Sequence, residues 1–319
     1  MLEIIEFLHY FTIAMVTGAS SVAVGIGEGL VGISAIQAIN IQPKARDDIQ
    51  KTAILGMALV ETAAIIGVSI AFILLLGTQQ ADKTIYLALS EIGIALGVSI
   101  SGFAIGLVSA MPAKAACLAI ARQPFFGNKI LRFMLITQSM IQTPVIFSFI
   151  IAMLIKNYAM TATTIEQSLQ LLASGLAIGL GSVGPAIGLG EFGKIACESI
   201  GINRKAYGKI FTFTLISEAV IETPIIFALL VSMLIISVPS PNLLKAIALV
   251  SSAFCIGIGT FGPGVSSGKT AGSACKQIAY NPNSYSSMSK LSIFAQSITG
   301  TAAIYALMIS ILLIVLNLG

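Results

Sequence analysis

Charged side chains are scarce in this chain of 319 residues. Lys, Arg, Asp and Glu make up 9% of the sequence, whereas soluble domains carry about a quarter. Hydrophobic residues make up 56% and the mean hydropathy is +0.98. This composition excludes an ordinary soluble domain and favours a polytopic membrane protein. The net charge of +4 comes mostly from short loops, so we expect no nucleic-acid partner.

The residues of common catalytic and cofactor sites are also scarce. The chain has one histidine, His9, and four cysteines. Three cysteines share one place in an internal repeat, which indicates a packing position and not a disulfide framework. We expect no ligand role for His9. No P-loop or Walker-type lysine is present, so we expect no catalytic site and no organic cofactor, and ATP chemistry must belong to a partner.

Long apolar stretches are plentiful, and a bilayer core needs about 20 apolar residues per helix. They predict an all-α membrane protein with eight transmembrane helices, at 10–40, 51–77, 86–121, 130–155, 167–201, 209–237, 244–279 and 289–316. Little sequence is left for a soluble domain.

Basic residues concentrate in the connections from odd to even helices. These are Lys44, Arg46, Lys51, Arg122, Lys129, Arg132, Arg204, Lys205 and Lys209. The opposite connections hold Asp82, Lys83, Lys156, Glu166 and Lys245. Because positive charge marks the cytoplasmic side, we predict cytoplasmic odd-to-even loops and both termini outside.

The odd-to-even loops reveal a repeat. Each contains a residue that we call the loop marker, and the markers are Pro43, Pro124, Arg204 and Pro282. They lie 81, 80 and 78 residues apart, so each unit is one helical hairpin of about eighty residues. The predicted hairpins are 1–80, 81–160, 161–240 and 241–319.

One position in the repeat alternates between charged and neutral residues. Eighteen residues after the markers stand Glu61, Gln142, Glu222 and Gly300. A threonine follows each of them, at Thr62, Thr143, Thr223 and Thr301. The segments "SMIQTPVIF" and "AVIETPIIF" are therefore one repeat position, without and with a carboxyl group.

The first helix of each hairpin is rich in glycine, as in "VGIGEGLVG" and "GLGSVGPAIGLGEFG". Small residues let membrane helices approach closely, while the second helices carry bulkier Ile, Leu, Phe and Met. This predicts small-residue helices inside and bulky helices outside. An ordinary bundle with small contact faces is the alternative.

A glycine-rich helix ending in Arg-Gln-Pro, followed after 18 residues by a mid-membrane carboxylate, resembles the c subunit of rotary ATP synthases, the proteolipid of the rotor ring. "ARQP" and "GPGVSSGKTAG" are more similar to the F-type protein, whereas fused hairpins are typical of vacuolar and archaeal-type proteolipids. The resemblance implies a two-layered homo-oligomeric ring in membrane lipid, turning against subunit a and its arginine. It also implies contacts between central-stalk subunits and the cytoplasmic loops, and Na+ or H+ as the transported ion.

In the sodium-binding branch of that family, a side-chain oxygen 15 residues before the loop proline joins the site. Those positions here are Glu28, Ser109, Leu189 and Ser267. The resemblance thus implies a Na+ site of Glu28, Glu61 and Thr62 in hairpin 1. Oxygen ligands suit hard cations, but a proton-only site stays open.

The other hairpins depart from that pattern. Leu189 cannot coordinate an ion, so Glu222 must rely on Thr223, a backbone carbonyl, Glu218 one turn away or a neighbouring hairpin. Gln142 is either a lost site or, with Thr143, a contributor to a neighbouring glutamate. Gly300 has no ligand, so we expect hairpin 4 to be inactive.

A charge pattern links hairpins 3 and 4. Glu191 and Lys269 lie 13 residues before their markers, and Glu198 and Lys276 lie six before. Because buried charges need partners, we predict the pairs Glu191–Lys269 and Glu198–Lys276, with local pairing on one helix as the alternative.

Three other functions remain open from the sequence. A vacuolar-type ATP-driven pump is favoured by hairpin fusion and opposed by the loop residues. A transporter or channel built of repeats would need broken helices around a substrate site, and a structural scaffold would not need Glu61 and Glu222.

Overall fold

The computed structural model describes residues 2–77 and 84–316. Across these residues all regular structure is helical, and eight spans are long and apolar enough to cross a membrane. The spans are Glu3–Ile41, Pro43–Gly77, Ile85–Arg122, Pro124–Ala159, Ile165–Ile202, Arg204–Ser237, Leu243–Tyr280 and Pro282–Val315. The predicted all-α fold is confirmed. The predicted boundary between 80 and 81, with Asp82 and Lys83, lies outside the described residues.

The helices follow the predicted hairpins. Hairpin 1 contains α1 (Leu2–Ile41), α2 (Arg46–Val60) and α3 (Thr62–Gly77). Hairpin 2 contains α4 (Ile85–Val108), α5 (Ala110–Arg122), α6 (Gly127–Ile141) and α7 (Thr143–Ala159). Hairpin 3 contains α8 (Ile165–Ile202) and α9 (Tyr207–Ser237), and hairpin 4 contains α10 (Leu243–Gly259), α11 (Phe261–Tyr280) and α12 (Tyr285–Val315).

Every loop marker begins a single 3-10 turn that reverses the chain. The turns are Pro43–Ala45, Pro124–Phe126, Arg204–Ala206 and Pro282–Ser284. Proline suits the first position of such a turn because its φ is fixed and its missing N–H has no partner to lose. In the turn without proline, the Asn203 side chain accepts a hydrogen bond from the Lys205 N–H at 3.1 Å.

Several spans are interrupted at the repeat positions singled out above. Breaks occur at Glu61, Ser109, Gln142 and Thr260. Three of them lie two or three residues before a proline (Pro112, Pro144 and Pro263), whose ring removes a backbone donor from the helix. The break at Glu61 has no proline beside it, and α9 continues without interruption past Glu222 despite Pro224.

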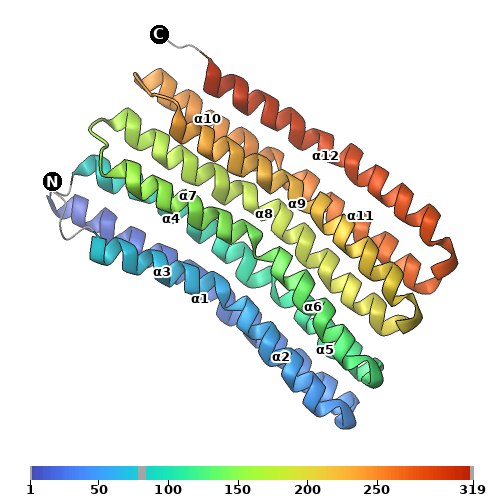
Figure 1. The fold of residues 1–319 in the computed structure, drawn as a ribbon. Coiled ribbons are helices and arrows are strands. Elements are labelled where there is room, and N and C mark those ends of the chain that lie inside the picture. The colour runs from blue at the N-terminus through green and yellow to red at the C-terminus, as the bar shows by residue number, and fades with distance from the viewer. Residues whose placement is uncertain (1, 78–83, 317–319) are drawn as a thin grey trace.

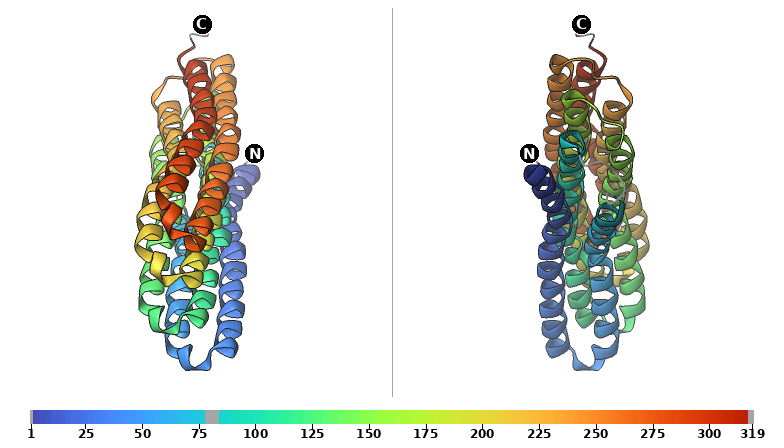
Figure 2. Two further views of the ribbon diagram at one scale, coloured as in Figure 1. Left: turned by 90° about the vertical axis from the view of Figure 1, so that its right-hand side faces the viewer. Right: turned by 90° about the vertical axis from the view of Figure 1, so that its left-hand side faces the viewer.

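The helices form two layers that run in chain order (Figures 1 and 2). The inner row is α1, then α4–α5, then α8, then α10–α11, and each member packs extensively on the next. The outer row is α2–α3, α6–α7, α9 and α12. Figure 1 shows hairpin 1 at one edge and hairpin 4 at the other, so the chain forms an open row of hairpins.

Glycines set the spacing within the inner row. A Cβ atom on Gly93 of α4 would lie 2.6 Å from the Leu171 carbonyl oxygen of α8. One on Gly175 would overlap the Gly93 backbone. The helices therefore touch backbone to backbone, as the small-residue pattern predicts. The outer row instead exposes bulky side chains such as Ile65, Phe72 and Leu230.

Polar side chains cap the ends of outer helices opposite the loop markers. The Lys156 ammonium donates to the Ile73 carbonyl of α3 at 3.3 Å. The Gln170 amide donates to carbonyls at the end of α9, and Lys245 donates to the Leu316 carbonyl after α12 at 2.8 Å. A helix C-terminus leaves carbonyls unpaired and favours positive charge, so these side chains stabilise the apolar helix ends.

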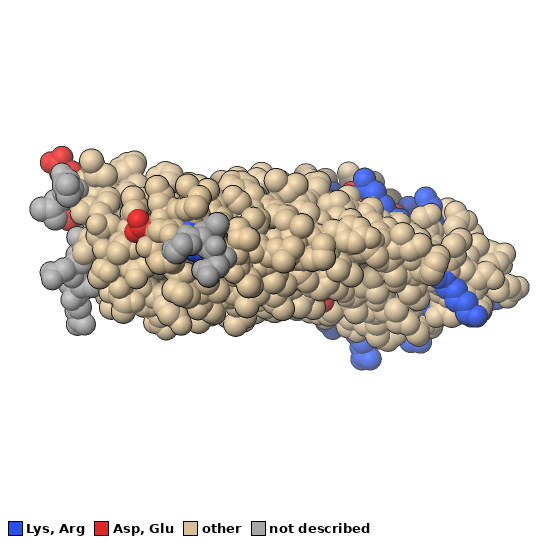
Figure 3. Space-filling model, turned by 90° about the horizontal axis from the view of Figure 1, so that it is seen from above, with Lys and Arg blue, Asp and Glu red and all other residues tan. Residues whose placement is uncertain are grey.

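The spans are longer than a bilayer core is thick. At 1.5 Å per residue, the 35-residue span Pro43–Gly77 is about 52 Å long, against about 30 Å of hydrocarbon. The extra turns project into water at the ends. On the face shown in Figure 3, Lys and Arg gather at the end that carries the loop markers.

Candidate ion-binding sites

The carboxylates of the alternating position lie midway along their spans. Glu61 is 18 residues after Pro43 and 16 before Gly77, and Glu222 is 18 after Arg204 and 15 before Ser237. Both belong to the outer row, where Glu61 is exposed and Glu222 half-buried. A charge at such a depth is costly unless it is neutralised or paired.

Hairpin 2 shows how the neutral version of the position is held. The Gln142 amide nitrogen donates to the Leu59 carbonyl of hairpin 1 at 3.0 Å and to the Ser109 hydroxyl of its own inner span at 2.9 Å. Gln142 is only 4% exposed. The structure thus brings together positions 18 after and 15 before the marker. The NH2 group occupies the place, among oxygen atoms, where a cation would otherwise be held.

Hairpin 3 carries a carboxyl group at the same position. Glu222 on α9 interacts through a side-chain hydrogen bond with Thr143 of α7, so hairpins 2 and 3 meet at this glutamate. Leu189, the inner-helix residue, is fully buried and offers no ligand. The Thr223 hydroxyl donates to the Ala219 carbonyl of its own helix at 3.1 Å.

Hairpin 1 places two carboxylates near each other. Glu28 of α1 is half-buried and lies within electrostatic range of Glu61. Thr62 follows Glu61 and is also half-buried. In the described part of the chain, no group of three or more His, Cys, Asp and Glu side chains could hold a metal ion. A cation here would therefore rely on two carboxylates with hydroxyl and carbonyl oxygens, a set that suits a hard monovalent ion.

Hairpin 4 lacks a ligand at the position. Gly300 has no side chain, and nothing lies within 4 Å of the place its Cβ would take. Ser267, the inner-helix residue, is buried. Thr301 is exposed at the edge of the row, and its hydroxyl donates to the Ile298 carbonyl at 2.7 Å.

A second polar position, which we did not identify from the sequence as part of the repeat, lies one turn earlier. Fourteen residues after the markers stand Met57, Gln138, Glu218 and Gln296. The Gln138 amide donates to the Gly56 carbonyl at 2.9 Å and the Ser109 carbonyl at 2.8 Å. Three polar residues at one repeat position in apolar helices were the available signal.

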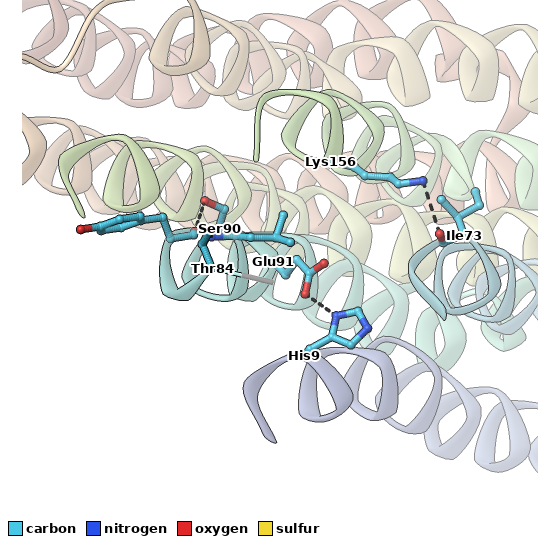
Figure 4. Close-up of polar contacts among 8 residues, drawn as sticks. His9, Ile73, Thr84, Ser90, Glu91 and Lys156 are labelled. Carbon is cyan, nitrogen blue, oxygen red and sulfur yellow. Dashed lines mark hydrogen bonds and ion pairs between the residues drawn. The ribbon is translucent and has the colours of Figure 1, made fainter. Parts of the chain in front are cut away.

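A buried ion pair near the other end was also missed. The Nδ1 atom of His9 on α1 lies 2.6 Å from a Glu91 carboxylate oxygen on α4, and both side chains are at least 95% buried (Figure 4). His9 is therefore not isolated, as the sequence had indicated. The signal was Glu91 itself, a carboxylate within an apolar stretch, which needs a partner.

The predicted pairs between hairpins 3 and 4 are wrong. Among residues 2–77 and 84–316, the His9–Glu91 pair is the one ion pair within 4.0 Å. Glu191 lines a cavity with Lys114 of α5, whereas Lys269 lines another with residues of α12. Equal height on adjacent helices did not imply facing sides, because Glu191 is directed toward hairpin 2 and Lys269 toward its own outer helix.

The repeat and its sites match a known family four times. The family model that describes the C subunit of ATP synthase matches residues 11–74, 92–155, 172–235 and 250–313. The chain belongs to the ATP synthase c-subunit family. Each matched segment covers most of one hairpin, so the chain is a fused four-hairpin member, and its eight apolar spans make it a multi-pass membrane protein.

Relatives of this c-subunit family member fall into two kinds. The ATP synthase c subunit of Dehalococcoides mccartyi is 47% identical over 70 residues, which are 22% of this chain and 92% of that protein. The ATP synthase c subunit of Chloroflexus aurantiacus is 36% identical over 69 residues, 22% of this chain and 91% of that protein. A-type ATP synthase subunit K of Methanocaldococcus jannaschii is 26% identical over 233 residues, 72% of this chain and 97% of that protein.

Proposed function

We propose that the chain is the rotor-ring subunit of an ion-translocating ATP synthase or ATPase, and that it carries Na+ or H+ on Glu61 and Glu222. The observation that carries this proposal is the sequence Glu, Gln, Glu, Gly at one repeat position halfway along the outer spans. Two of the four hairpins then transport ions, while all four build the ring.

Ion binding makes the two glutamates tolerable in lipid. A carboxylate near the bilayer centre costs several kcal/mol unless a proton or cation neutralises it. A fixed positive charge, such as the arginine that family resemblance assigns to subunit a, favours the ionised form and releases the bound ion. Ion exchange is then tied to the position of each glutamate as the ring turns.

The edges of the row support assembly into a homo-oligomeric ring. Thr143 of hairpin 2 interacts with Glu222 of hairpin 3. Glu61 of hairpin 1 has no preceding hairpin in its own chain and is exposed. The hairpin 4 edge of a second copy would present Thr301 to Glu61 in the same relation, so the Glu61 site is complete only in the assembly.

Hairpin 1 favours Na+. Glu28, Glu61 and Thr62 supply two carboxylates and a hydroxyl, and two close carboxylates cannot both ionise cheaply. One carboxyl group retains a proton while the other helps to hold the cation, which leaves the site neutral. Gln142 with Thr143 serves as a neutral neighbour of the Glu222 site.

The charge distribution supports one orientation in the membrane. Lys and Arg gather at the end that carries the loop markers, including Lys44, Arg122 and Lys205. We place this end in the cytoplasm, where it meets the central-stalk subunits, and both termini on the outer side. ATP binding and hydrolysis or synthesis belong to those partners.

An A/V-type ion pump is the second candidate, and one observation favours it. The likeness to the archaeal subunit K extends over 72% of this chain, whereas each bacterial relative matches a single hairpin. Hairpin fusion is thus shared with the archaeal protein, while sequence identity within a hairpin is higher with the bacterial proteins.

Labelling with a hydrophobic carbodiimide tests the proposed carriers. Membranes containing the assembled protein are labelled at constant pH with Na+ or K+, and the modified peptides are identified by mass spectrometry. We expect labelling of Glu61 and Glu222, slowed by Na+ but not by K+ at a sodium site, and slowed only by high pH at a proton site. Absence of labelling at both residues would contradict the proposal.

A further inference from the structure

Glu218 is a buried carboxyl group that the proposed mechanism does not yet use. It lies on α9, is fully buried, and neither of its carboxyl oxygens has a hydrogen-bond partner among the described residues. No Lys, Arg or His of the described chain pairs with it. An isolated buried carboxylate is strongly unfavourable, so this group must hold a proton or share a cation.

The repeat shows that packing does not require an acid at this place. Hairpins 2 and 4 have the amides Gln138 and Gln296, and hairpin 1 has Met57. Gln138 satisfies its amide nitrogen on backbone carbonyls, and the Gln296 amide donates to the Ser292 hydroxyl at 3.1 Å. Only hairpin 3 has an ionisable group here, and it is also the hairpin that retains a carboxylate 18 residues after its marker together with a leucine in the inner helix.

The neighbours of Glu218 indicate which ion site it belongs to. Glu222 follows four residues later, on the same face of a continuous helix, and lies within electrostatic range. The nearby Cys197 and Cys275 thiols are also within range of Glu218. Thr143 reaches Glu222 from hairpin 2. The inner helix contributes Leu189, so the oxygen that it lacks is available from Glu218.

We propose that Glu218 is the second carboxyl group of the Glu222 ion site, the part that Glu28 has beside Glu61. This inference rests on the proposed function. Two carboxylates with one retained proton and one bound monovalent cation are neutral together. Both carrier sites are then two-carboxyl sites, but hairpin 1 takes its second carboxyl from the inner helix and hairpin 3 from the preceding turn of the outer helix.

The variant Glu218→Gln tests this role with little change in shape, because glutamine already occupies the position in two hairpins. Carbodiimide labelling of Glu222 is followed against the concentration of the protecting ion, either Na+ at constant pH or H+ in Na+-free buffer. We expect the Na+ concentration for half-protection, or the proton concentration for half-maximal labelling, to change at least tenfold at Glu222. The response of Glu61 in the same chain should stay unchanged.

The control variant is Gln138→Met, which copies hairpin 1 and should leave both glutamates unchanged. An unaltered Glu222 response in Glu218→Gln overturns the inference while the proposed function stands. An equal change at Glu61 overturns it as well, because the effect is then not specific to hairpin 3. If neither glutamate labels in the unmodified chain, the proposed function and this inference both fail.

Discussion

Restoring a carboxyl group in hairpin 2 should create a third ion site. The variant Gln142→Glu removes the amide that donates to the Leu59 carbonyl at 3.0 Å and the Ser109 hydroxyl at 2.9 Å. The introduced carboxyl group then faces a carbonyl and a hydroxyl oxygen. A carboxylate, a hydroxyl and a carbonyl are a suitable start for a hard cation, so ion binding should replace the lost amide contacts.

The magnitude follows from those two hydrogen bonds. Each contributes about 0.5–1.5 kcal/mol, so without an ion the variant should lose about 1–3 kcal/mol of unfolding free energy. An ion at 100 times its dissociation constant restores about 2.7 kcal/mol. Because the protonated form suits the apolar site, the variant should also lose stability as the pH rises.

Thermal unfolding in detergent, followed by helical circular dichroism, measures both effects. Gln142→Glu should unfold at a lower temperature than the unmodified protein in Na+-free buffer at high pH, and recover on addition of the transported ion or acid. The matched control Gln142→Leu loses the same hydrogen bonds but should not recover. Equal ion and pH responses of the two variants would refute the cation-site interpretation of Gln142.

Two further predictions concern packing and the buried ion pair. Gly175→Ala should destabilise the protein because the added methyl overlaps the Gly93 backbone; overpacking costs about 1–3 kcal/mol against a helix-propensity gain of at most about 1. Gly208→Ala, where nothing lies within 4 Å, should be neutral or slightly stabilising, and identical unfolding temperatures would contradict the backbone contact. His9→Ala should cost about 3–5 kcal/mol by leaving Glu91 unpaired, and adding Glu91→Gln should recover part of that loss in the same assay.

The sequence predicted the eight spans and the layers because these depend on local patterns. Apolar length sets the spans, and the glycine content of the first helices sets the inner row, as the Gly93–Gly175 contact illustrates. The repeat count also located Gln142 and Ser109, which the structure joins at 2.9 Å. Spacing from a shared turn is enough to align two helices of one hairpin.

Contacts between hairpins were harder to predict because they depend on helix rotation as well as height. Glu191 and Lys269 share a height but are directed to different neighbours. His9 and Glu91 belong to different hairpins, and no motif links them. In the sequence Glu218 is only a residue one turn from Glu222, because its burial without a partner is visible only once α9 is packed.

The number of ion carriers per chain is the most direct test of the account. Carbodiimide labelling to saturation in membranes, followed by mass measurement of the intact chain, should give two adducts per chain. Glu61→Gln and Glu222→Gln should each remove one adduct, and the double variant should have none. A different adduct number at saturation, or two adducts that persist in the double variant, would contradict the claim that two of four hairpins carry ions.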